Sequence, residues 1–221
     1  MMELLEGIKT RRSTRAFKPT PIPEKTMRSI LEVAGKSPSF TNTQPWEVVV
    51  VSGRKRDKLS KILLDSAKSG APPNPDMPLP TTWPSELEER SREHHMKRAG
   101  FLGIDMEQER ERGASRLLNL EFYGAPCALF LFIDSTLSTW SILDMGIFAQ
   151  SIILAAHSFG VGSCLQAMVT LYPDAVRDFL GIPKTKKLII GISMGYPDSE
   201  AKANAYQSDR IGLDDFVQWY S

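Results

Sequence analysis

Residues 127–159 read CALFLFIDSTLSTWSILDMGIFAQSIILAAHSF. The first part, residues 127–133, is a continuous apolar run, which is typical of a strand that other elements cover on both faces. The second part, residues 138–159, carries apolar side chains on nearly every side of a helix. Such a helix must be buried all round, either in the core of the chain or against a second subunit. The stretch therefore predicts a central strand followed by a central helix.

The rest of the chain supplies further strands and helices around this stretch. β-Branched residues without alternation predict a second covered strand over 46–51, and residues 187–194 predict a third. Ser85 followed by Glu88 fits a capping box at a helix start, and residues 160–168 indicate a glycine-bearing turn. Apolar residues at helical spacing predict helices over 3–9, 23–34 and 55–68, and a short helix is predicted over 174–180. Residues 85–98 and 107–118 are charge-rich stretches that are also predicted to be helical.

This mixture of elements predicts an α+β fold, resembling an α/β sandwich, in which helices flank a central mixed or antiparallel sheet. No strand is followed by a GxGxxG turn, so the standard dinucleotide-binding fold has no support. The length of 221 residues suits a single domain over residues 1–221.

Composition excludes several classes of function. The chain has 27 basic and 26 acidic residues and a net charge of +1, so no overall field favours nucleic acid or a membrane as partner. The N-terminus lacks the pattern of a secretory signal, and the apolar segment 145–156 is too short to span a bilayer. Cys127 and Cys164 form no metal-ligand spacing and are interpreted as reduced thiols of a cytoplasmic protein without a metal site.

A proline-rich segment interrupts the helical pattern. Residues 70–84 hold six prolines, which exclude a packed helix or strand and predict a long loop. The charged helices that follow continue the inserted region to about residue 111. Residues 195–221 form a C-terminal extension with little pattern of its own.

Three short clusters carry side chains suited to a ligand. Arg11, Arg12, Ser13 and Arg15 offer cationic forks and a hydroxyl to a phosphate or a sugar chain, although their spacing alone favours a solvated helix end, because pairs of arginines are common. Residues 38–46, PSFTNTQPW, hold amides, hydroxyls and aromatic rings that could bind the edge of a heteroatom-rich ring, or form an ordinary polar turn. The glycines of residues 160–164, GVGSC, allow close backbone approach to a flat ligand or a tight turn.

Taken together and in order, these clusters match one family. The segments are RRSTR at 11–15, PSFTNTQPW at 38–46, NLEFYGAP at 119–126, GVGSC at 160–164 and GYP at 195–197, followed by Arg210. In this order and spacing the chain resembles the FMN-dependent nitroreductase family, and in particular its nitrobenzoate reductase-type members. Each motif alone is weak, but five in register are strong.

The resemblance implies an intertwined homodimer with FMN at the subunit interface. It assigns the phosphate, the ribityl chain and one flavin edge to Arg11, Arg12, Ser13 and Arg15, with Arg210 closing on the phosphate. Many relatives carry a second cation two residues before that arginine, where this chain has Ser208. The resemblance places Gly162 and Ser163 near the reactive flavin nitrogen, with Cys164 beside them. Residues lining the flavin, some of them from the partner subunit, would be Pro38, Ser39, Phe40, Asn42 and Gln44.

The resemblance also implies the activity. FMN would take electrons from NADH or NADPH and pass them to a nitroaromatic or quinone-like acceptor by a ping-pong mechanism, with no obligatory general base. The insertion at about 70–111 resembles a substrate lid, with Trp83, Arg90, Arg92, Phe101 and Leu102 as candidate lid residues. Two alternatives remain open, a reductive dehalogenase of halogenated phenols and a flavin-binding protein with little turnover.

The histidines receive no catalytic role. His94 and His95 fall in a charged helix that is predicted to be exposed, and His157 falls in the apolar helix, where a buried, hydrogen-bonded histidine is expected.

Overall fold

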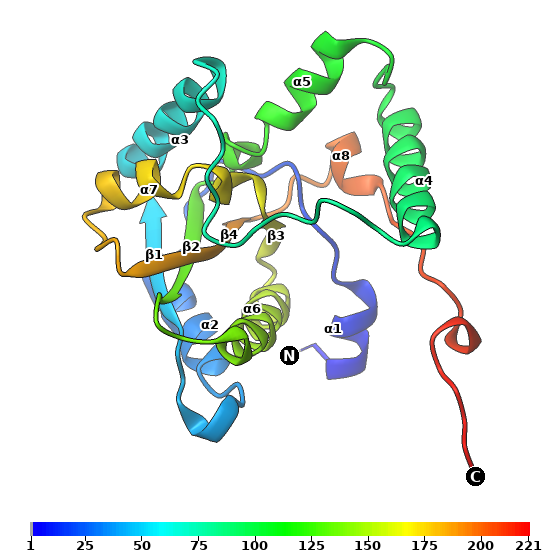
Figure 1. Cartoon of the computed structure of the whole chain (residues 1–221), viewed down its shortest axis with the longest axis horizontal. Helices are drawn as coiled ribbons and strands as arrows, with labels where there is room; N and C mark the ends of the chain where they lie inside the picture. The colour runs from blue at the N-terminus through cyan, green and yellow to red at the C-terminus, as the bar shows by residue number, and fades with distance from the viewer. Residues whose placement is uncertain (1) are drawn as a thin grey trace.

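Four antiparallel strands form one sheet in the computed structural model, which describes residues 2–221 (Figure 1). The strands are β1 (Glu47–Ser52), β2 (Cys127–Asp134), β3 (Gly162–Gln166) and β4 (Lys186–Gly195), in the order β1-β2-β4-β3. Helices cover both faces of this sheet, so the predicted α+β sandwich is confirmed.

One pair of helices packs on each face of the sheet. The helices α2 (Glu24–Ala34) and α6 (Thr139–Ser158) cover one face, and α3 (Gly53–Lys68) and α7 (Pro173–Leu180) cover the other. The side chains of β2 alternate between the two faces because successive residues of a strand point in opposite directions. Leu129 and Leu131 join the core under α2 and α6, whereas Phe130 and Phe132 join the core under α3 and α7. The apolar run of residues 127–133 thus lies between two hydrophobic cores.

The long helix α6 is buried on its sheet side only. Met145, Phe148 and Ile152 lie in the core, but Trp140 and Leu143 on the opposite side are 56% and 55% exposed. Burial all round, as the sequence predicts, is therefore not reached within one chain. By length and composition α6 is also apolar enough to cross a membrane, but half of that stretch is buried inside the protein.

Three local predictions are wrong. The segment 160–168 is not only a turn, because residues Gly162–Gln166 form β3 at one edge of the sheet. The strand β1 is not covered on both faces: it forms the other edge, and Val50 is 44% exposed. Ser85 does not cap its helix, because α4 (Ser85–Leu102) begins with Pro84 in the capping position and no side-chain cap bond.

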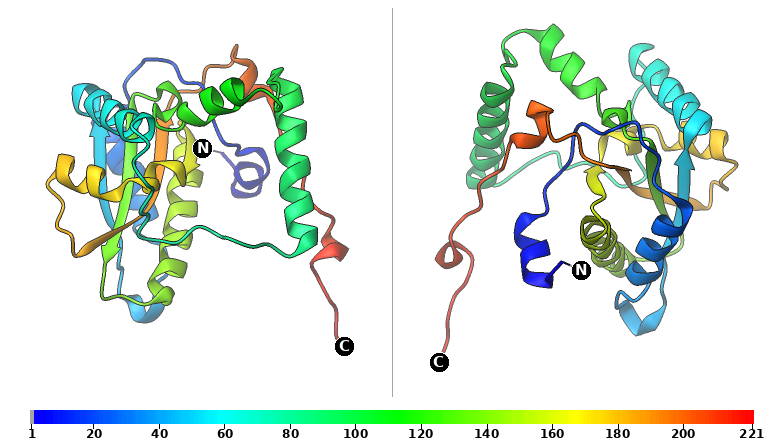
Figure 2. Two further views of the ribbon diagram at one scale, coloured as in Figure 1. Left: turned by 45° about the horizontal axis from the view of Figure 1, so that its top comes forward. Right: turned by 180° about the vertical axis from the view of Figure 1, so that it is seen from behind.

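The inserted region and both ends of the chain lie outside these layers. The proline-rich loop crosses the molecule to α4, and α5 (Glu109–Leu117) returns the chain to β2. Helix α1 (Leu4–Thr10) stands apart from the sheet, and the segment after α8 (Lys202–Ala205) runs past α4 and away from the body (Figure 2). Short 3-10 turns complete the chain at Phe40–Asn42 (η1), Phe122–Gly124 (η2), Met168–Leu171 (η3) and Leu213–Asp215 (η4).

Candidate functional site

A cationic cavity of about 770 Å³ opens where the two ends of the chain meet the insertion. Its walls come from the segment after α1, from α4, from α6 and from the C-terminal segment. None of the described residues that line it is Asp or Glu. The polar and charged side chains of its wall include Arg11, Arg12, Ser13, Arg15, His94, Gln150, Tyr206, Ser208 and Arg210. The structure therefore brings together the four N-terminal site residues and Arg210, which the sequence separates by almost the whole chain.

The N-terminal segment is held in place by β3. Ser13 and Ser163 form a parallel bridge, and the Thr14 backbone N–H donates to the Ser163 carbonyl at 2.9 Å. This approach requires Gly162, because a Cβ there would lie 2.5 Å from Thr14 Oγ1 and 2.8 Å from Pro197 Cγ. Gly162 thus serves the packing of two backbone segments as well as any approach to a ligand.

Asn204 organises the same wall, and sequence reasoning missed it. Its Oδ1 accepts the Arg15 backbone N–H at 2.7 Å, and its Nδ2 donates to the Ala16 carbonyl at 2.7 Å. Its own carbonyl accepts Arg12 Nη1 at 3.2 Å. The buried Asn204 side chain thus ties the C-terminal extension to the cationic segment. No local pattern signals this role, because an asparagine in a four-residue helix carries no periodicity.

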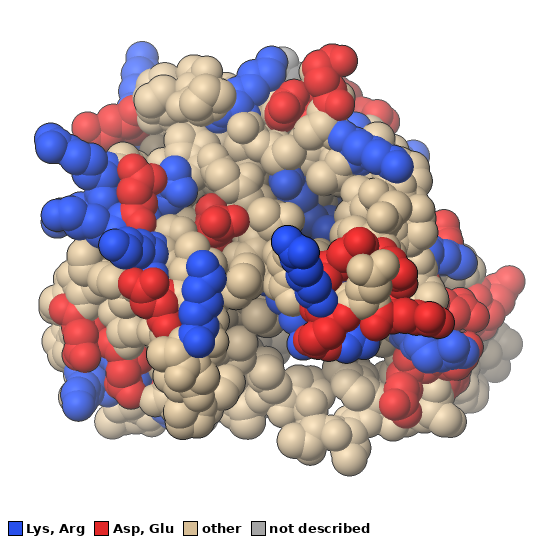
Figure 3. Space-filling model, turned by 90° about the horizontal axis from the view of Figure 1, so that it is seen from above, with Lys and Arg blue, Asp and Glu red and all other residues tan. Residues whose placement is uncertain are grey.

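The electrostatics of the cavity are those of an anion site. Burial lowers the pKa of Arg11, and the charge of Arg210 lowers it further. The pKa of His94 is lowered by burial and then by the positive charges of His95, Arg15, Arg98 and Arg210. Acidic and basic side chains are interspersed over the face seen in Figure 3, so the acid-free cavity differs from that surface.

Ser208 holds Arg210 in the cavity wall. Arg210 Nη1 donates to Ser208 Oγ at 2.7 Å and to the Ser208 carbonyl at 3.0 Å. The serine that replaces a second cation therefore orients the remaining arginine, and Asp209 beside it pairs with Lys97 at 3.0 Å instead of Arg210.

The histidines differ from their predicted settings. His94 is half-buried in the cavity wall, and Tyr206 Oη lies 3.4 Å from its Nδ1. His157 is partly exposed, and its Nε2 lies 2.9 Å from Thr10 Oγ1. A second cavity of about 460 Å³ adjoins His157 and has Gly162 and Ser163 in its wall.

The thiols are buried and protonated. Burial raises the pKa of Cys164, and the nearby charge of Arg15 opposes that rise. Burial raises the pKa of Cys127 to about 12. Both cysteines are interpreted as core residues, since a thiol must ionise to act as a nucleophile.

The loop of residues 38–44 lies elsewhere. The Phe40 backbone N–H donates to Asp144 Oδ1 at 3.0 Å, and the Phe40 ring stacks on Trp140 at 5.5 Å, near the first turn of α6. Along α6, at 1.5 Å per residue, His157 lies about 20 Å beyond Asp144, and Gln150, the residue of this helix in the cavity wall, lies about 9 Å beyond it. Within one chain, the loop residues that are predicted to line the flavin do not lie at the cavity. These residues are Pro38, Ser39, Phe40, Asn42 and Gln44.

The same loop has an unusual backbone. Thr41, Asn42 and Gln44 have φ angles of +48°, +60° and +49°. Such conformations persist where the surroundings fix them and are concentrated at ligand clamps and active sites. The Gln44 backbone N–H donates to Ser39 Oγ at 3.0 Å, which helps to fix the turn.

The candidate lid residues divide into two groups. Arg90 and Arg92 pair with Glu86 and Glu89 along the exposed side of α4, and Trp83 is 51% exposed before that helix. None of these three lines the cavity. Phe101 contacts the Tyr206 ring at 5.5 Å, and Leu102 ends the helix. The side chain that α4 presents to the cavity is His94, which sequence reasoning had set aside.

Comparison with known proteins finds relatives over nearly the whole chain. Residues 8–196 match the model of the Nitroreductase family. The chain is 39% identical to nitroreductase NfnB of Mycolicibacterium smegmatis, over 96% of this chain and 90% of the relative. It is 34% identical to a 4-nitrobenzoate reductase of Pseudomonas putida, over 92% of this chain and 89% of the relative.

Solved structures give the same result. The crystal structure of the FMN-dependent nitroreductase NfnB from Mycobacterium smegmatis in complex with NADPH has a TM-score of 0.93 and 38% identity, covering 97% of this chain and 96% of that one. The FMN and NADPH-dependent nitroreductase NfnB from Sphigopyxis sp. strain HMH has a TM-score of 0.96 and 28% identity, with both chains covered completely.

Proposed function

The chain belongs to the Nitroreductase family, and we propose that it is an FMN-dependent oxidoreductase that takes electrons from NADH or NADPH and passes them to nitroaromatic or quinone-like acceptors. The observation that carries this proposal is the acid-free cavity in which Arg11, Arg15 and Arg210 converge. The relatives named for FMN, NADPH and 4-nitrobenzoate support the cofactor, the donor and the acceptor class.

The residues present fit FMN. Arginine forks match the oxygens of a phosphate, and Arg11, Arg12 and Arg210 supply three of them at one cavity. We assign the phosphate to these three residues, and the ribityl chain and one flavin edge to Ser13 and Arg15. Gly162 and Ser163 stand beside this wall on β3, where they would border the reactive edge of the ring.

The bound FMN supplies the redox chemistry, and the protein supplies binding and orientation. The cations Arg11 and Arg210 hold the phosphate end. The backbone bridge between Ser13 and Ser163 fixes the distance between the phosphate-binding segment and β3. Donor and acceptor would use the same open side of the cavity in turn, which gives ping-pong kinetics.

We also propose a homodimer, because one side of α6 lacks a partner. Trp140, Leu143, Ile147 and Leu154 follow each other at intervals of three, four and seven residues, as in a helix–helix seam, and the first two are more than half exposed. The neighbouring α1 exposes its own apolar side chains, with Leu4 at 67% and Leu5 at 70%. A second copy on this surface would cover it and could bring its residues 38–44 to the cavity of the first.

We place the protein in the cytoplasm, where its buried thiols would stay reduced. The reductase names of the relatives favour nitroaromatic or quinone reduction over a dehalogenase or a flavin-binding protein with little turnover.

The visible spectrum of the purified protein, before and after anaerobic addition of NADPH or NADH, tests this proposal. We expect flavin bands that bleach with a nicotinamide and return when nitrobenzoate or a quinone is added. Bands that persist with both donors would favour the flavin-binding alternative. A colourless protein that takes up no added FMN would contradict the cofactor and the site residues.

A further inference from the structure

The insertion helix α4 is attached to the rest of the chain through its second half. Residues 85–93 of this helix are all exposed. Its partly or fully buried side chains are those of His94, Arg98, Ala99 and Leu102. Within residues 2–221, the described hydrogen bonds, ion pairs and ring contacts between α4 and other elements all lead to residues 202–209. The position of the helix therefore depends on the C-terminal segment.

Tyr206 is the centre of this attachment. The centroid of its ring lies 5.5 Å from that of Phe101 and 5.8 Å from that of His94. Its Oη lies 3.4 Å from His94 Nδ1. Lys97 Nζ pairs with Asp209 Oδ2 at 3.0 Å on the same side of the helix. The phenol ring thus contacts α4 at two positions that are seven residues apart, which fixes both the place and the rotation of the helix.

The same C-terminal segment carries the arginine that is assigned to the phosphate. Tyr206 and Arg210 lie four residues apart in the wall of the cationic cavity, and His94 lines that cavity with them. Ser208 lies between them in the chain, and its Oγ accepts Arg210 Nη1 at 2.7 Å. Because one short segment holds both side chains, His94 is placed at the end of the cavity where Arg210 lies.

His94 offers a hydrogen-bond donor to this cavity. Burial and the neighbouring positive charges lower its pKa, so the ring is neutral at physiological pH and carries a single proton. The Tyr206 hydroxyl donates to Nδ1, since the reverse arrangement would leave the phenol proton without a described acceptor. The ring proton then lies on Nε2. Among residues 2–221, none of the described hydrogen bonds involves His94 Nε2, so its N–H is available to a ligand.

We propose that His94 is a fourth ligand of the cofactor phosphate, that Tyr206 is the residue that positions it, and that phosphate binding thereby fastens α4 to the body of the protein. This inference rests on the proposed function. A phosphate presents three oxygens that are strong hydrogen-bond acceptors, so an imidazole N–H can bind beside the forks of the arginines.

The place of His94 favours the phosphate over the acceptor molecule. Gly162 and Ser163, which are assigned to the reactive edge of the flavin, line the neighbouring cavity. His94 and Arg210 line the cationic cavity together. The ligand group that meets His94 is therefore the one that binds Arg210.

Titration of the apoprotein with FMN and with riboflavin tests this contact, because the two ligands differ only in the phosphate. His94→Phe removes the N–H but keeps an aromatic ring beside Tyr206, and His95→Phe on the exposed side of α4 is the matched control. We expect His94→Phe to raise the dissociation constant of FMN by about 10- to 100-fold, as for a lost hydrogen bond to a charged group. The constant for riboflavin, and both constants in His95→Phe, should change by less than about 3-fold, as for a surface substitution.

Tyr206→Phe tests the positioning. It keeps both ring contacts but removes the hydroxyl beside Nδ1, so the dissociation constant of FMN should rise by less than it does in His94→Phe. Because the hydroxyl acts through His94, the double variant should bind FMN no more weakly than His94→Phe alone. Additive losses in the double variant would contradict a positioning role.

Hydrogen exchange of the α4 amides measures the fastening of the helix. FMN should slow this exchange in the wild type, riboflavin should not, and His94→Phe should lose the difference. Equal losses of FMN and riboflavin affinity in His94→Phe, an unchanged FMN constant, or a change confined to the KM for 4-nitrobenzoate would each overturn the inference and leave the proposed function in place. A wild-type protein that binds neither FMN nor riboflavin would contradict the proposed function itself.

Discussion

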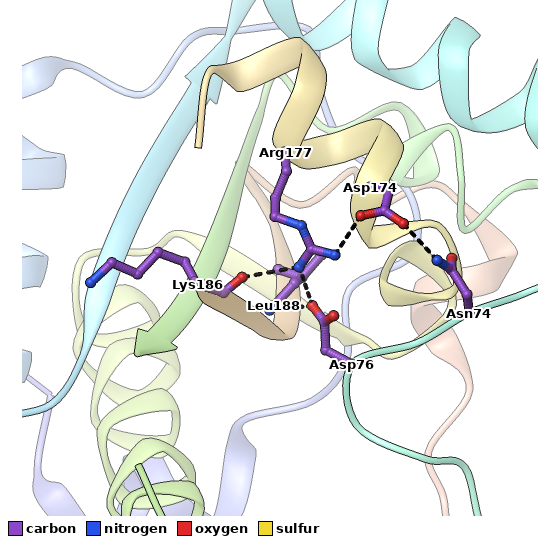
Figure 4. Close-up of polar contacts among 6 residues, drawn as sticks. All are labelled: Asn74, Asp76, Asp174, Arg177, Lys186 and Leu188. Atoms are coloured by element: carbon purple, nitrogen blue, oxygen red, sulfur yellow. Dashed lines mark hydrogen bonds and ion pairs between the residues drawn. The ribbon is translucent and has the colours of Figure 1, made fainter. Parts of the chain in front are cut away.

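Arg177 and Asp76 form a buried ion pair between α7 and the proline-rich segment (Figure 4). Their side chains are 7% and 15% exposed. Asp76 Oδ2 also accepts the Leu188 backbone N–H at 2.8 Å, and Arg177 Nη1 donates to the Lys186 carbonyl at 3.0 Å. The part of the insertion around Asp76 is therefore held against the sheet, and a movement of the lid would involve the residues that follow it.

Asp76→Ala should unfold the protein more easily, because it leaves Arg177 charged in a buried place. The free energy of unfolding should fall by about 3–5 kcal/mol. Asp174→Ala removes the other partner of the same arginine, but Asp174 is 48% exposed, and we expect a loss of at most about 1 kcal/mol. Urea denaturation of the two variants measures the difference, and equal losses would contradict a structural role for Asp76.

Because Asp76 fastens the insertion to the sheet, a deletion of residues 78–83, which retains Asp76, tests the lid more cleanly than a deletion of residues 70–84. We expect the shorter deletion to change substrate preference more than FMN retention.

Arg12→Ala should weaken FMN binding with little unfolding. Arg12 is exposed on the cavity wall and makes one hydrogen bond to the Asn204 carbonyl. Loss of a charge-assisted contact of about 1.5–3 kcal/mol corresponds to roughly 10- to 150-fold in the dissociation constant. Titration of the apoprotein with FMN and with riboflavin measures the effect, which should be absent for riboflavin. Full FMN occupancy in the variant would remove Arg12 from the phosphate site.

Gly162→Ala should separate the N-terminal segment from β3. Its Cβ would meet Thr14 Oγ1 at 2.5 Å, and overpacking of this kind costs about 1–3 kcal/mol. Both the melting temperature and FMN affinity should fall. Gly113→Ala in α5 is the control, because its Cβ meets no atom within 4 Å. If Gly162→Ala behaves like Gly113→Ala, the bridge between Ser13 and Ser163 does not depend on this glycine.

Leu143→Glu should prevent dimer formation. The side chain is 55% exposed in the seam on α6, so a charge there costs little in one chain but would be buried in a dimer. Light scattering after gel filtration measures the mass. Leu118→Glu, at a side chain that is 46% exposed beyond α5, should leave the mass unchanged. A wild-type protein that is monomeric at micromolar concentration would contradict the proposed dimer.

His94 should make the apoprotein less stable in weak acid. Its pKa lies below the ordinary 6.5, because burial and the charges of His95, Arg15, Arg98 and Arg210 disfavour the imidazolium. The unfolded chain then binds the proton more readily, so the free energy of unfolding falls as pH decreases below about 6.5. His94→Gln should reduce this slope. Part of the slope should remain in that variant, because the pKa of His157 is also lowered, by burial and by the charges of Arg11 and Arg12. Denaturation between pH 5.5 and 7.5 measures the slope. His95→Gln removes one of the charges that lower the His94 pKa and should therefore reduce the slope less than His94→Gln does. An unchanged slope in His94→Gln would exclude this role.

Local patterns predict the middle of the fold well. The apolar run of β2, the helical spacing of α2 and the length of α6 each depend on residues close in sequence, and each appears near its predicted bounds. The order of the motifs also predicts the family, which the comparisons confirm. The sequence does not predict His94, Asn204 or Tyr206, because their contacts are with residues 112 to 192 positions away along the chain.

The covered strand, the central helix and the cationic segment at residues 11–15 can be predicted from the sequence, because hydrophobic periodicity and charge depend on residues that are neighbours along the chain. That Gly162–Gln166 forms a strand is visible in the folded chain alone, since its pairing with β4 depends on backbone hydrogen bonds and not on apolar side chains. The tertiary structure also places Arg210 in one cavity wall with Arg11 and Arg15, whereas it holds Phe40 against Asp144 of α6, away from that wall. The physical reason is that electrostatic and packing interactions act between residues that are close in space, whereas sequence patterns depend only on residues that are close along the chain.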